Sequence, residues 1–350
     1  MMTRNELITR LESPLGELSD DRELFAEAAA VRDRTIGRRV YLRGLIELSN
    51  RCRKNCLYCG IRSGMDGVGR YELTDEQVFA AVQRAWRAGY GSVVLQAGER
   101  VDEAFVGRVE RLVRRIKRLS DGALGITLSL GEQAPQTYRR WFEAGAHRYL
   151  LRIEASSPEL YRRIHPADHS YRERLHSLRV LREVGYQVGT GVMIGLPFQR
   201  VEDLADDLLF FKESDIDMCG MGPYIEAPGT PLAACSSLWT RAERLQLALR
   251  MIALLRLLMP DINIAATTAL HALHPRGREL GVEAGANVLM PNLTPEEGRG
   301  EYRLYDDKPM EDTDLRGFDA VLENVWGDSP HFAARLRSSS SGSSADGSEK

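Results

Sequence analysis

Short apolar runs alternate with longer stretches of helical period along the chain from residue 40 onward. Each run has the composition of a buried strand, and each longer stretch repeats its apolar positions at steps of three and four. The runs predict eight strands, at residues 41–48, 92–96, 124–129, 148–153, 187–194, 218–221, 263–266 and 287–290. Strands separated by helices pair in parallel through right-handed crossovers, and eight such units close a barrel. The pattern predicts an α/β fold, a complete (βα)8 TIM-type barrel. A six-stranded partial barrel is the alternative, since the sixth and seventh runs are weak.

Two of the helical stretches carry further signals. The helix predicted over 74–88 begins with a capping box, in which Thr74 and Gln77 satisfy free backbone amides. The next helix places apolar residues along one buried face, at Phe105, Val109, Leu112, Ile116 and Leu119. Basic residues stand beside them, at Arg108, Arg111, Arg114, Arg115, Lys117 and Arg118. At helical spacing these are expected to form a solvated outer face, with a nucleic-acid surface as the alternative.

Segments of a different character flank the barrel pattern. Residues 1–39 read as an N-terminal helical extension with helices at 5–11 and 20–35, and the barrel is expected to span 40–310. Residues 311–337 are expected to form a C-terminal helical segment. The tail 338–350 reads SSSSGSSADGSEK and has one alanine as its only apolar residue, so it is expected to be disordered.

Composition and charge narrow the class of protein. Hydrophobic residues make up 43% of the 350 residues and charged residues 28%, which excludes wholesale disorder, collagen and coiled coil. The net charge of −3 supports neither a nucleic-acid-coating surface nor a polybasic membrane anchor. Residues 1–14 contain no apolar signal core, and the most apolar helix, 247–260, is interrupted by Arg250 and Arg256. We therefore expect a cytoplasmic protein without a membrane or nucleic-acid partner.

The cysteines are unevenly distributed. The chain has five, and Cys52, Cys56 and Cys59 lie at C-x3-C-x2-C spacing, an odd and clustered set that argues against a disulfide framework. Three thiolates can hold three irons of a four-iron, four-sulfur cluster and leave the fourth iron open, whereas such clusters normally use four cysteines. Zinc is the alternative, but Cys219 and Cys235 are isolated in the sequence and zinc needs four ligands. Three histidines could serve as further ligands, but none lies at a typical metal-ligand spacing from the three cysteines: His147, His165 and His169.

Polar residues follow the predicted strands at their carboxyl ends, where barrels of this type build active sites. Asn50 to Gly60 follow the first strand, Gln96 to Glu99 the second, and Ser129 to Glu132 the third. Arg148 and Arg152 share one face of the fourth strand by period two. The convergence of these ends favours an enzyme over a structural barrel.

The cysteine spacing, with Tyr58 just before the third cysteine, resembles the radical S-adenosylmethionine (SAM) superfamily. The resemblance implies a 4Fe-4S cluster as metal centre on the triad, with the open iron chelated by SAM, and reductive cleavage of SAM to a 5′-deoxyadenosyl radical. It assigns Gly98 and Glu99 to the methionine amino group, Glu154 to the sulfonium or ribose and Arg174 to the carboxylate. The full set implied for SAM is Tyr58, Gln96, Gly98, Glu99, Ser129, Glu154, Arg174 and Met193. A loop glycine for Gly98 and a surface ion pair for Arg174 are the alternatives.

Longer motifs are similar to the HydE family of FeFe-hydrogenase maturases, among them NRCRKNCLYCG, VLQAGE, TLSLGE, RYLLRIE, MCGMGPYIEAPGTPL, AATTA and GANVLMPNLTP. The resemblance implies a role in building the diiron subcluster of the hydrogenase H-cluster, with the maturases HydG and HydF and an electron donor as partners. It implies a cysteine-bound iron complex with carbon monoxide and cyanide as substrate. Residues implied as catalytic or substrate-binding are Arg148, Arg152, Thr267, Thr268, Met290, Tyr302 and Tyr305. Paired arginines suit an anionic guest.

Two positions depart from the family pattern. Some members carry a second cluster on three C-terminal cysteines, but no cysteine follows Cys235 here and Met310 stands near where the first would be. Ile153 occupies a position where members can carry a histidine, which puts an accessory role there in doubt. The nearest alternative function is a radical mutase like methylornithine synthase, which would need carboxylates for a cationic amino acid. Biotin synthase would need more cysteines, and a zinc-binding docking scaffold is the alternative outside enzymes.

Overall fold

The computed structural model describes residues 2–305, 308, 321–322 and 325–341. Its main sheet is parallel and contains the eight predicted strands in the order β10, β1, β2, β3, β4, β5, β7 and β9. Their bounds are Val288–Leu289 (β10), Val40–Ser49 (β1), Ser92–Ala97 (β2), Gly125–Ser129 (β3), Arg148–Leu150 (β4), Gln187–Thr190 (β5), Met218–Cys219 (β7) and Asn263–Ile264 (β9). The Asn287 amide donates to the Ile264 carbonyl at 2.9 Å, and the Ala266 amide to the Val288 carbonyl at 3.0 Å. These bonds join β9 to β10, so the predicted barrel is confirmed and the six-stranded alternative is wrong.

One predicted strand is divided in two, and another ends early and is followed by a further short strand. The run 187–194 forms β5 and then β6 (Met193–Ile194), and the chain after β7 continues into β8 (Gly222–Pro223), which pairs with β6. Gly191 lies against Gly220 at the break, where a side-chain Cβ would come within 2.2 Å of the Gly220 carbonyl oxygen. Glycine permits this close approach of the two backbones between the paired strands.

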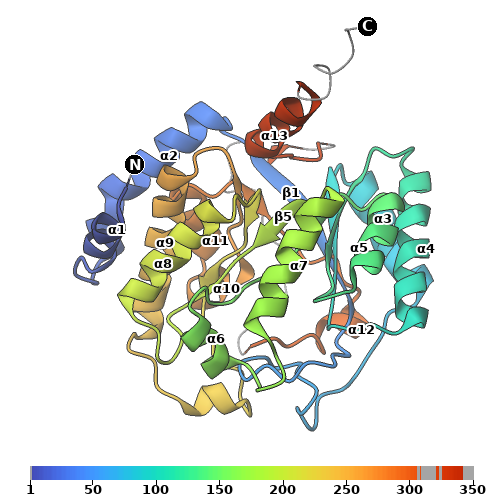
Figure 1. Ribbon diagram of the computed structural model, residues 1–350, viewed down its shortest axis with the longest axis horizontal. Helices are drawn as coiled ribbons and strands as arrows, with labels where there is room; N and C mark the ends of the chain where they lie inside the picture. Colours follow the sequence, from blue (N-terminus) through green and yellow to red (C-terminus); the bar gives the residue numbers. More distant parts are fainter. Residues whose placement is uncertain (1, 306–307, 309–320, 323–324, 342–350) are drawn as a thin grey trace, which may run out of the picture.

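Helices cover the outside of the barrel (Figure 1). They are α3 (Asp75–Arg87), α4 (Glu103–Leu119), α5 (Pro135–Glu143), α6 (Pro158–Ile164), α7 (Tyr171–Val184), α8 (Val201–Glu213), α9 (Arg241–Leu258), α10 (Thr268–Leu273), α11 (Gly277–Glu283) and α12 (Glu296–Arg299). The capping box of Thr74 and Gln77 is present at the start of α3. On α4 the predicted apolar face is buried except for Leu119, which is half-buried. Arg111 and Arg114 are exposed, and Arg115 is half-buried. None of the described helices has the length and apolar character needed to cross a membrane.

Helices from both ends of the chain pack on this barrel. In front of β1 lie α1 (Arg4–Leu11), the short 3-10 helix η1 (Leu18–Asp21) and α2 (Arg22–Thr35). The buried Arg250 of α9 donates to the carboxylate of Asp21 at 2.8 Å, which fixes this extension. Towards the C-terminus, β11 (Val321–Leu322) pairs with β1, and α13 (Pro330–Ser341) follows. The strand β11 thus lies within 311–337, where the sequence predicts a helical segment. Helix α13 also runs past Ser338, and Met310 lies outside the described residues.

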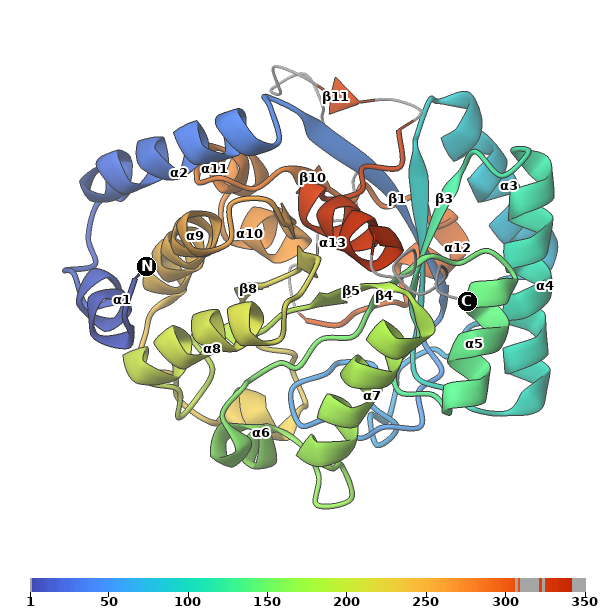
Figure 2. The ribbon, with the colours of Figure 1, turned by 45° about the horizontal axis from the view of Figure 1, so that its top comes forward.

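Residues 325–341 cover the amino-terminal end of the barrel. Figure 2 shows α13 across this end, among the labels of β4, β5 and β10. Arg335 of α13 donates to Asp217, the residue before β7, at 2.7 Å. The Gly327 carbonyl accepts from the buried Arg43 of β1 at 3.1 Å and from Asn263 of β9 at 2.8 Å. The opposite end, where the strands finish, remains available for a site.

Candidate active site

A cavity of about 340 Å³ lies at the carboxyl ends of the strands. Its volume falls within the range of small-molecule sites. The structure brings nearly all of the predicted site residues to its wall: Cys52, Tyr58, Cys59, Gln96, Gly98, Glu99, Ser129, Arg152, Glu154, Arg174, Met193, Thr267, Thr268, Met290, Tyr302 and Tyr305. Residues far apart in the sequence therefore converge on one space, as the strand-end pattern predicts.

The cysteine loop that follows β1 is held against the end of β2. The Glu99 amide donates to the Cys52 sulfur at 3.3 Å, and the Arg53 amide donates to the Glu99 carbonyl at 2.9 Å. Gly98 lies so close to this loop that a Cβ would come within 2.7 Å of the Cβ of Cys52. The absence of a side chain at Gly98 thus lets the two loops meet.

The three thiols form a donor set suited to iron. Burial raises the pKa of Cys52 and Cys59, and it raises the pKa of Cys56 to about 12. Without a compensating positive charge these thiols stay protonated, whereas a bound metal ion deprotonates a coordinating thiol. The other described cysteines lie apart: Cys219 is buried in the main apolar core, and Cys235 follows the 3-10 helix η2 (Pro231–Ala234). Three thiols, two of them on the cavity wall, fit a cluster with one open iron.

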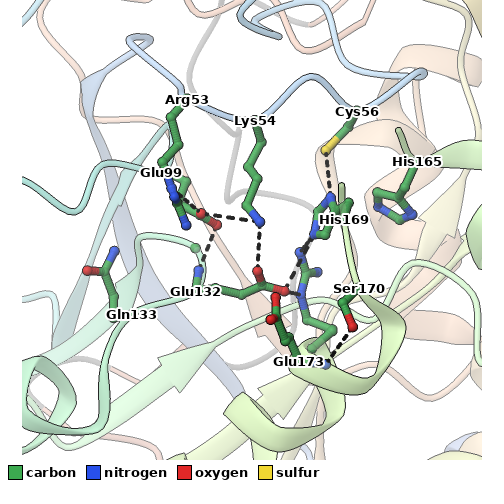
Figure 3. A network of polar contacts seen from close by, with 12 residues as sticks. Arg53, Lys54, Cys56, Glu99, Glu132, Gln133, His165, His169, Ser170 and Glu173 are labelled. Atoms are coloured by element: carbon green, nitrogen blue, oxygen red, sulfur yellow. Dashed lines mark hydrogen bonds and ion pairs between the residues drawn. The ribbon is translucent and has the colours of Figure 1, made fainter. Parts of the chain in front are cut away.

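A network of ion pairs lies beside the cysteine loop (Figure 3). Glu132, after β3, accepts from Lys54 at 2.8 Å and from Arg174 of α7 at 2.6 Å. Glu99 accepts from Arg53 at 2.8 Å and from the Glu132 amide at 2.8 Å. Burial would raise the pKa of Glu132, but its contacts with His169, Arg174 and Lys54 hold that pKa well below its ordinary value. The network holds Arg174 in a fixed position relative to the cysteine loop. The sequence pattern did not predict a role for Lys54 or Glu132.

Two histidines also lie at the triad, contrary to the expectation from their sequence spacing. The side-chain ligand atoms of Cys56, His165 and His169 all lie within 4.8 Å of one another. His165 ends α6 and His169 precedes α7, so this turn brings both to Cys56, more than a hundred residues away in sequence. No short-range spacing could have revealed the contact.

Arg152 and Glu154 stand at the end of β4. Arg152 donates to the Val192 carbonyl at 2.8 Å and lies 3.1 Å from a carboxylate oxygen of Glu154. Glu154 has a φ of +65°, a left-handed conformation that few non-glycine residues adopt and that often accompanies functional positions. Ile153 between them is fully buried in the apolar core, and its amide donates to the Thr190 hydroxyl at 3.0 Å.

Arg148 does not lie in the cavity, which corrects the prediction of an arginine pair there. It is the first residue of β4 and is 2% exposed, at the amino-terminal end of the barrel. Its guanidinium donates to Asp328 at 2.7 Å and to the Trp326 carbonyl. Arg148 and Arg152 share a strand face, but four residues separate them by about 13 Å along a strand. Two side chains on the same face of a strand can therefore lie at different depths in the barrel.

A second ion pair lines the cavity away from the cysteines. The Lys308 ammonium donates to the buried carboxylate of Glu47 at 2.5 Å and to the Tyr302 carbonyl at 2.7 Å. The Tyr302 hydroxyl accepts from Gln96 at 3.2 Å, which joins this pair to β2. Burial raises the pKa of Tyr305, also on this wall. Glu47 lies inside a strongly apolar strand, so the sequence pattern gave no signal for it.

Comparisons with known proteins agree with this geometry. Residues 46–211 match the family model of the radical SAM superfamily. The [FeFe] hydrogenase maturase subunit HydE of Thermotoga maritima is 45% identical over 286 residues, which is 81% of this chain and 79% of that protein. A crystal structure of methylornithine synthase (PylB) superposes with a TM-score of 0.73 at 28% identity, over 83% of this chain and 82% of that one.

A structure of the maturase HydG from Carboxydothermus hydrogenoformans shares the fold, with a TM-score of 0.72 at 20% identity over 87% of this chain and 71% of that one. The agreement of the barrel, the cysteine loop and the extent of identity to HydE decides the classification. The chain is a radical SAM enzyme of the HydE family of [FeFe]-hydrogenase maturases.

Proposed function

We propose that this enzyme holds a 4Fe-4S cluster on Cys52, Cys56 and Cys59, binds SAM beside it, and acts on a small iron complex during assembly of the diiron subcluster of FeFe hydrogenase. The substrate class is a cysteine-bound iron complex with carbon monoxide and cyanide ligands. HydG, HydF and an electron donor would be its partners, in the cytoplasm. The observation that carries the proposal is the single cavity that joins the three-cysteine loop at one end to Arg152, Thr267 and Tyr302.

The residues of the cavity wall fall into two groups, one for the cofactor and one for the substrate. When bound, the cluster and SAM together supply a 5′-deoxyadenosyl radical. Glu99 and Gly98 would receive the methionine amino group through carboxylate charge and close backbone approach, and Glu154 would face the ribose or sulfonium. Arg174 would contribute positive charge toward the carboxylate, although its nitrogens already have protein partners in Glu132, His169 and the Arg152 carbonyl. Tyr58, Gln96, Ser129 and Met193 would complete the SAM side.

Arg152 would hold the substrate through its guanidinium, whose planar donors suit carboxylate and cyanide groups. Its Nη2 is committed to the Val192 carbonyl, while its Nε has no hydrogen-bond partner among the described residues. Thr267 and Thr268 would add hydroxyl donors, and Met290, Tyr302 and Tyr305 an apolar and aromatic wall that excludes water. Arg148 is not proposed for this role, because it lies at the other end of the barrel.

Contrary to the sequence-based argument against the mutase alternative, carboxylates do line the cavity. Glu47, Glu99 and Glu154 lie there, but each is paired with a cation: Lys308 at 2.5 Å, Arg53 at 2.8 Å and Arg152 at 3.1 Å respectively. A cationic amino acid would have to displace one of these partners. The 45% identity to HydE, against 28% to methylornithine synthase, supports the maturase function.

In vitro hydrogenase maturation with this protein as the only varied maturase tests the proposal, with hydrogen evolution as the readout. The wild-type protein should support maturation. Arg152→Ala should retain uncoupled SAM cleavage but lose maturation, because Arg152 is assigned to the substrate. Arg111→Ala, on the exposed face of α4, is the matched control and should leave both activities unchanged. Equal loss of both activities in Arg152→Ala would move this residue to the cofactor side.

A further inference from the structure

His169 forms a bridge between a cysteine of the triad and the ion-pair network. Its Nδ1 lies 3.8 Å from the Cys56 sulfur, within hydrogen-bond distance for a sulfur partner. Its Nε2 lies 2.9 Å from an Nη of Arg174. The histidine side chain is 1% exposed, so water cannot substitute for either partner. Figure 3 shows the imidazole between the sulfur and the network around Glu132.

The contact of Arg174 with Nε2 of His169 determines that the ring proton lies on Nδ1. A guanidinium has only donors, so Nε2 must accept from Arg174 and therefore carries no proton. A neutral imidazole then bears its single proton on Nδ1, which points to the sulfur of Cys56. A doubly protonated ring would set N–H against N–H at 2.9 Å. A Glu132 oxygen also lies near Nε2, at 3.5 Å, but this approach is longer than the 2.9 Å to the Arg174 nitrogen.

Arg174 is itself held in place, so the tautomer is imposed by a fixed group. Its Nε donates to Glu132 at 2.6 Å, and its Nη1 donates to the Arg152 carbonyl. Glu132 is anchored in turn by Lys54 of the cysteine loop at 2.8 Å. The chain of contacts runs from Lys54 through Glu132, Arg174 and His169 back to Cys56, and so closes on the loop where it starts.

A separate metal site of Cys56, His165 and His169 is a weaker reading of the same cluster. The nitrogens of His165 have other partners, since Nδ1 lies 2.9 Å from the Tyr161 carbonyl and Nε2 lies 3.3 Å from the Tyr58 hydroxyl. His165 instead packs against the ring of His169, with centroids 4.4 Å apart. It holds the His169 ring in position and makes no bond of its own to Cys56.

We propose that His169 is a positioning residue that donates an Nδ1–H hydrogen bond to the Cys56 thiolate and raises the reduction potential of the cluster. The inference rests on the proposed function, in which Cys56 ligates one iron. Hydrogen bonds to cluster sulfurs withdraw negative charge and favour the reduced state, and partners of this kind tune metal centres. Through His169, the charge network around Arg174 would influence the reduction potential of the cluster.

The test compares cluster potentials in reconstituted holoenzyme by redox titration monitored with electron paramagnetic resonance. His169→Phe, which keeps a ring but has no donor, should shift the midpoint potential to a more negative value. His169→Gln, which restores an N–H donor, should return most of the shift. His165→Phe changes the same aromatic cluster without removing a donor to cysteine and should leave the potential near that of the wild type.

A second measurement uses the wild-type protein, so it tests the inference even if a variant does not assemble its cluster. Wild-type holoenzyme labelled with ¹⁵N-histidine should show a weak ¹⁵N coupling to the reduced cluster in pulsed resonance. An unchanged potential in His169→Phe, absence of the coupling, or a coupling as strong as that of an iron-bound imidazole would overturn the inference while leaving the proposed function intact. A wild-type protein that binds no iron would instead overturn the proposed function itself, and this inference with it.

Discussion

Removal of the Asp328 carboxylate is expected to destabilise the barrel strongly, because it leaves buried positive charge without a counter-ion. The Arg148 side chain is 2% exposed, and Asp328 is its carboxylate partner at 2.7 Å. Arg43 is fully buried nearby, and burial together with the charge of Arg148 lowers its pKa. Within the described residues no other ion pair is made by either guanidinium. Asp328→Ala would thus isolate two buried cations at once.

The expected cost follows from the burial of Arg148, whose charge stays out of water when its partner is removed. Loss of one partner of a buried ion pair costs about 3–5 kcal/mol, and each kcal/mol lowers the melting temperature of a domain this large by about 2–4 °C. We therefore expect a fall of roughly 10 °C for Asp328→Ala. Arg148→Met should cost much less, because Asp328 is 37% exposed and keeps a bond from Gln187 at 2.7 Å.

Thermal and urea unfolding of both single variants and of the double variant measures this coupling. The double variant Asp328→Ala with Arg148→Met should be more stable than Asp328→Ala alone, because the second change removes one isolated charge. Arg148→Met should also retain maturation activity. Equal destabilisation by the two single variants would refute the electrostatic reasoning, and loss of maturation in a stable Arg148→Met protein would return Arg148 to the substrate.

Two further variants test the cysteine loop and the barrel wall. Gly98→Ala should abolish cluster assembly, measured as iron content, since its Cβ would come within 2.7 Å of the Cβ of Cys52; Gly107→Ala in α4, with no atom nearer than 3.5 Å, is the control. Burial raises the pKa of Asp207 from 3.8 to about 7, so its contribution to stability should fall as the pH rises from about 4 to 7. This decrease in the free energy of unfolding is on the order of 4 kcal/mol at most. Asp207→Asn should remove it, as measured by unfolding at pH 4 and pH 7.

Each of these outcomes has a clear contrary result. Iron content in Gly98→Ala equal to that of Gly107→Ala would show that the close approach of the two loops is not required. A wild-type protein whose stability rises from pH 4 to pH 7, with the same rise in Asp207→Asn, would show that Asp207 is not buried as a protonated carboxyl.

The strand positions and the cavity wall could be predicted because both follow from local patterns. Apolar runs mark β1 to β3 within one or two residues, and polar residues after the strands mark the mouth. Period two also placed Arg148 and Arg152 on one face, but the pattern contains no measure of depth, and the C-terminal segment that binds Arg148 is not visible in it.

The contacts that complete the site depend on tertiary structure. Cys56 and His169 meet across 113 positions, and Glu47 and Lys308 across 261, so neither pair has a spacing to recognise. Glu47 is also hidden among apolar neighbours in a strand whose every residue is buried. Such pairs are set by where the loops and the chain beyond the last strand fold back, which no local pattern encodes.

The measurement that tests the central claim most directly is 5′-deoxyadenosine formation from SAM by anaerobically reconstituted protein with a strong reductant, together with its metal content. The account predicts about four irons per chain and steady product formation, both lost in Cys52→Ala, Cys56→Ala and Cys59→Ala, because each cysteine is the sole protein ligand of one iron. Product formation that survives any of the three changes, or one zinc per chain without iron, would contradict it.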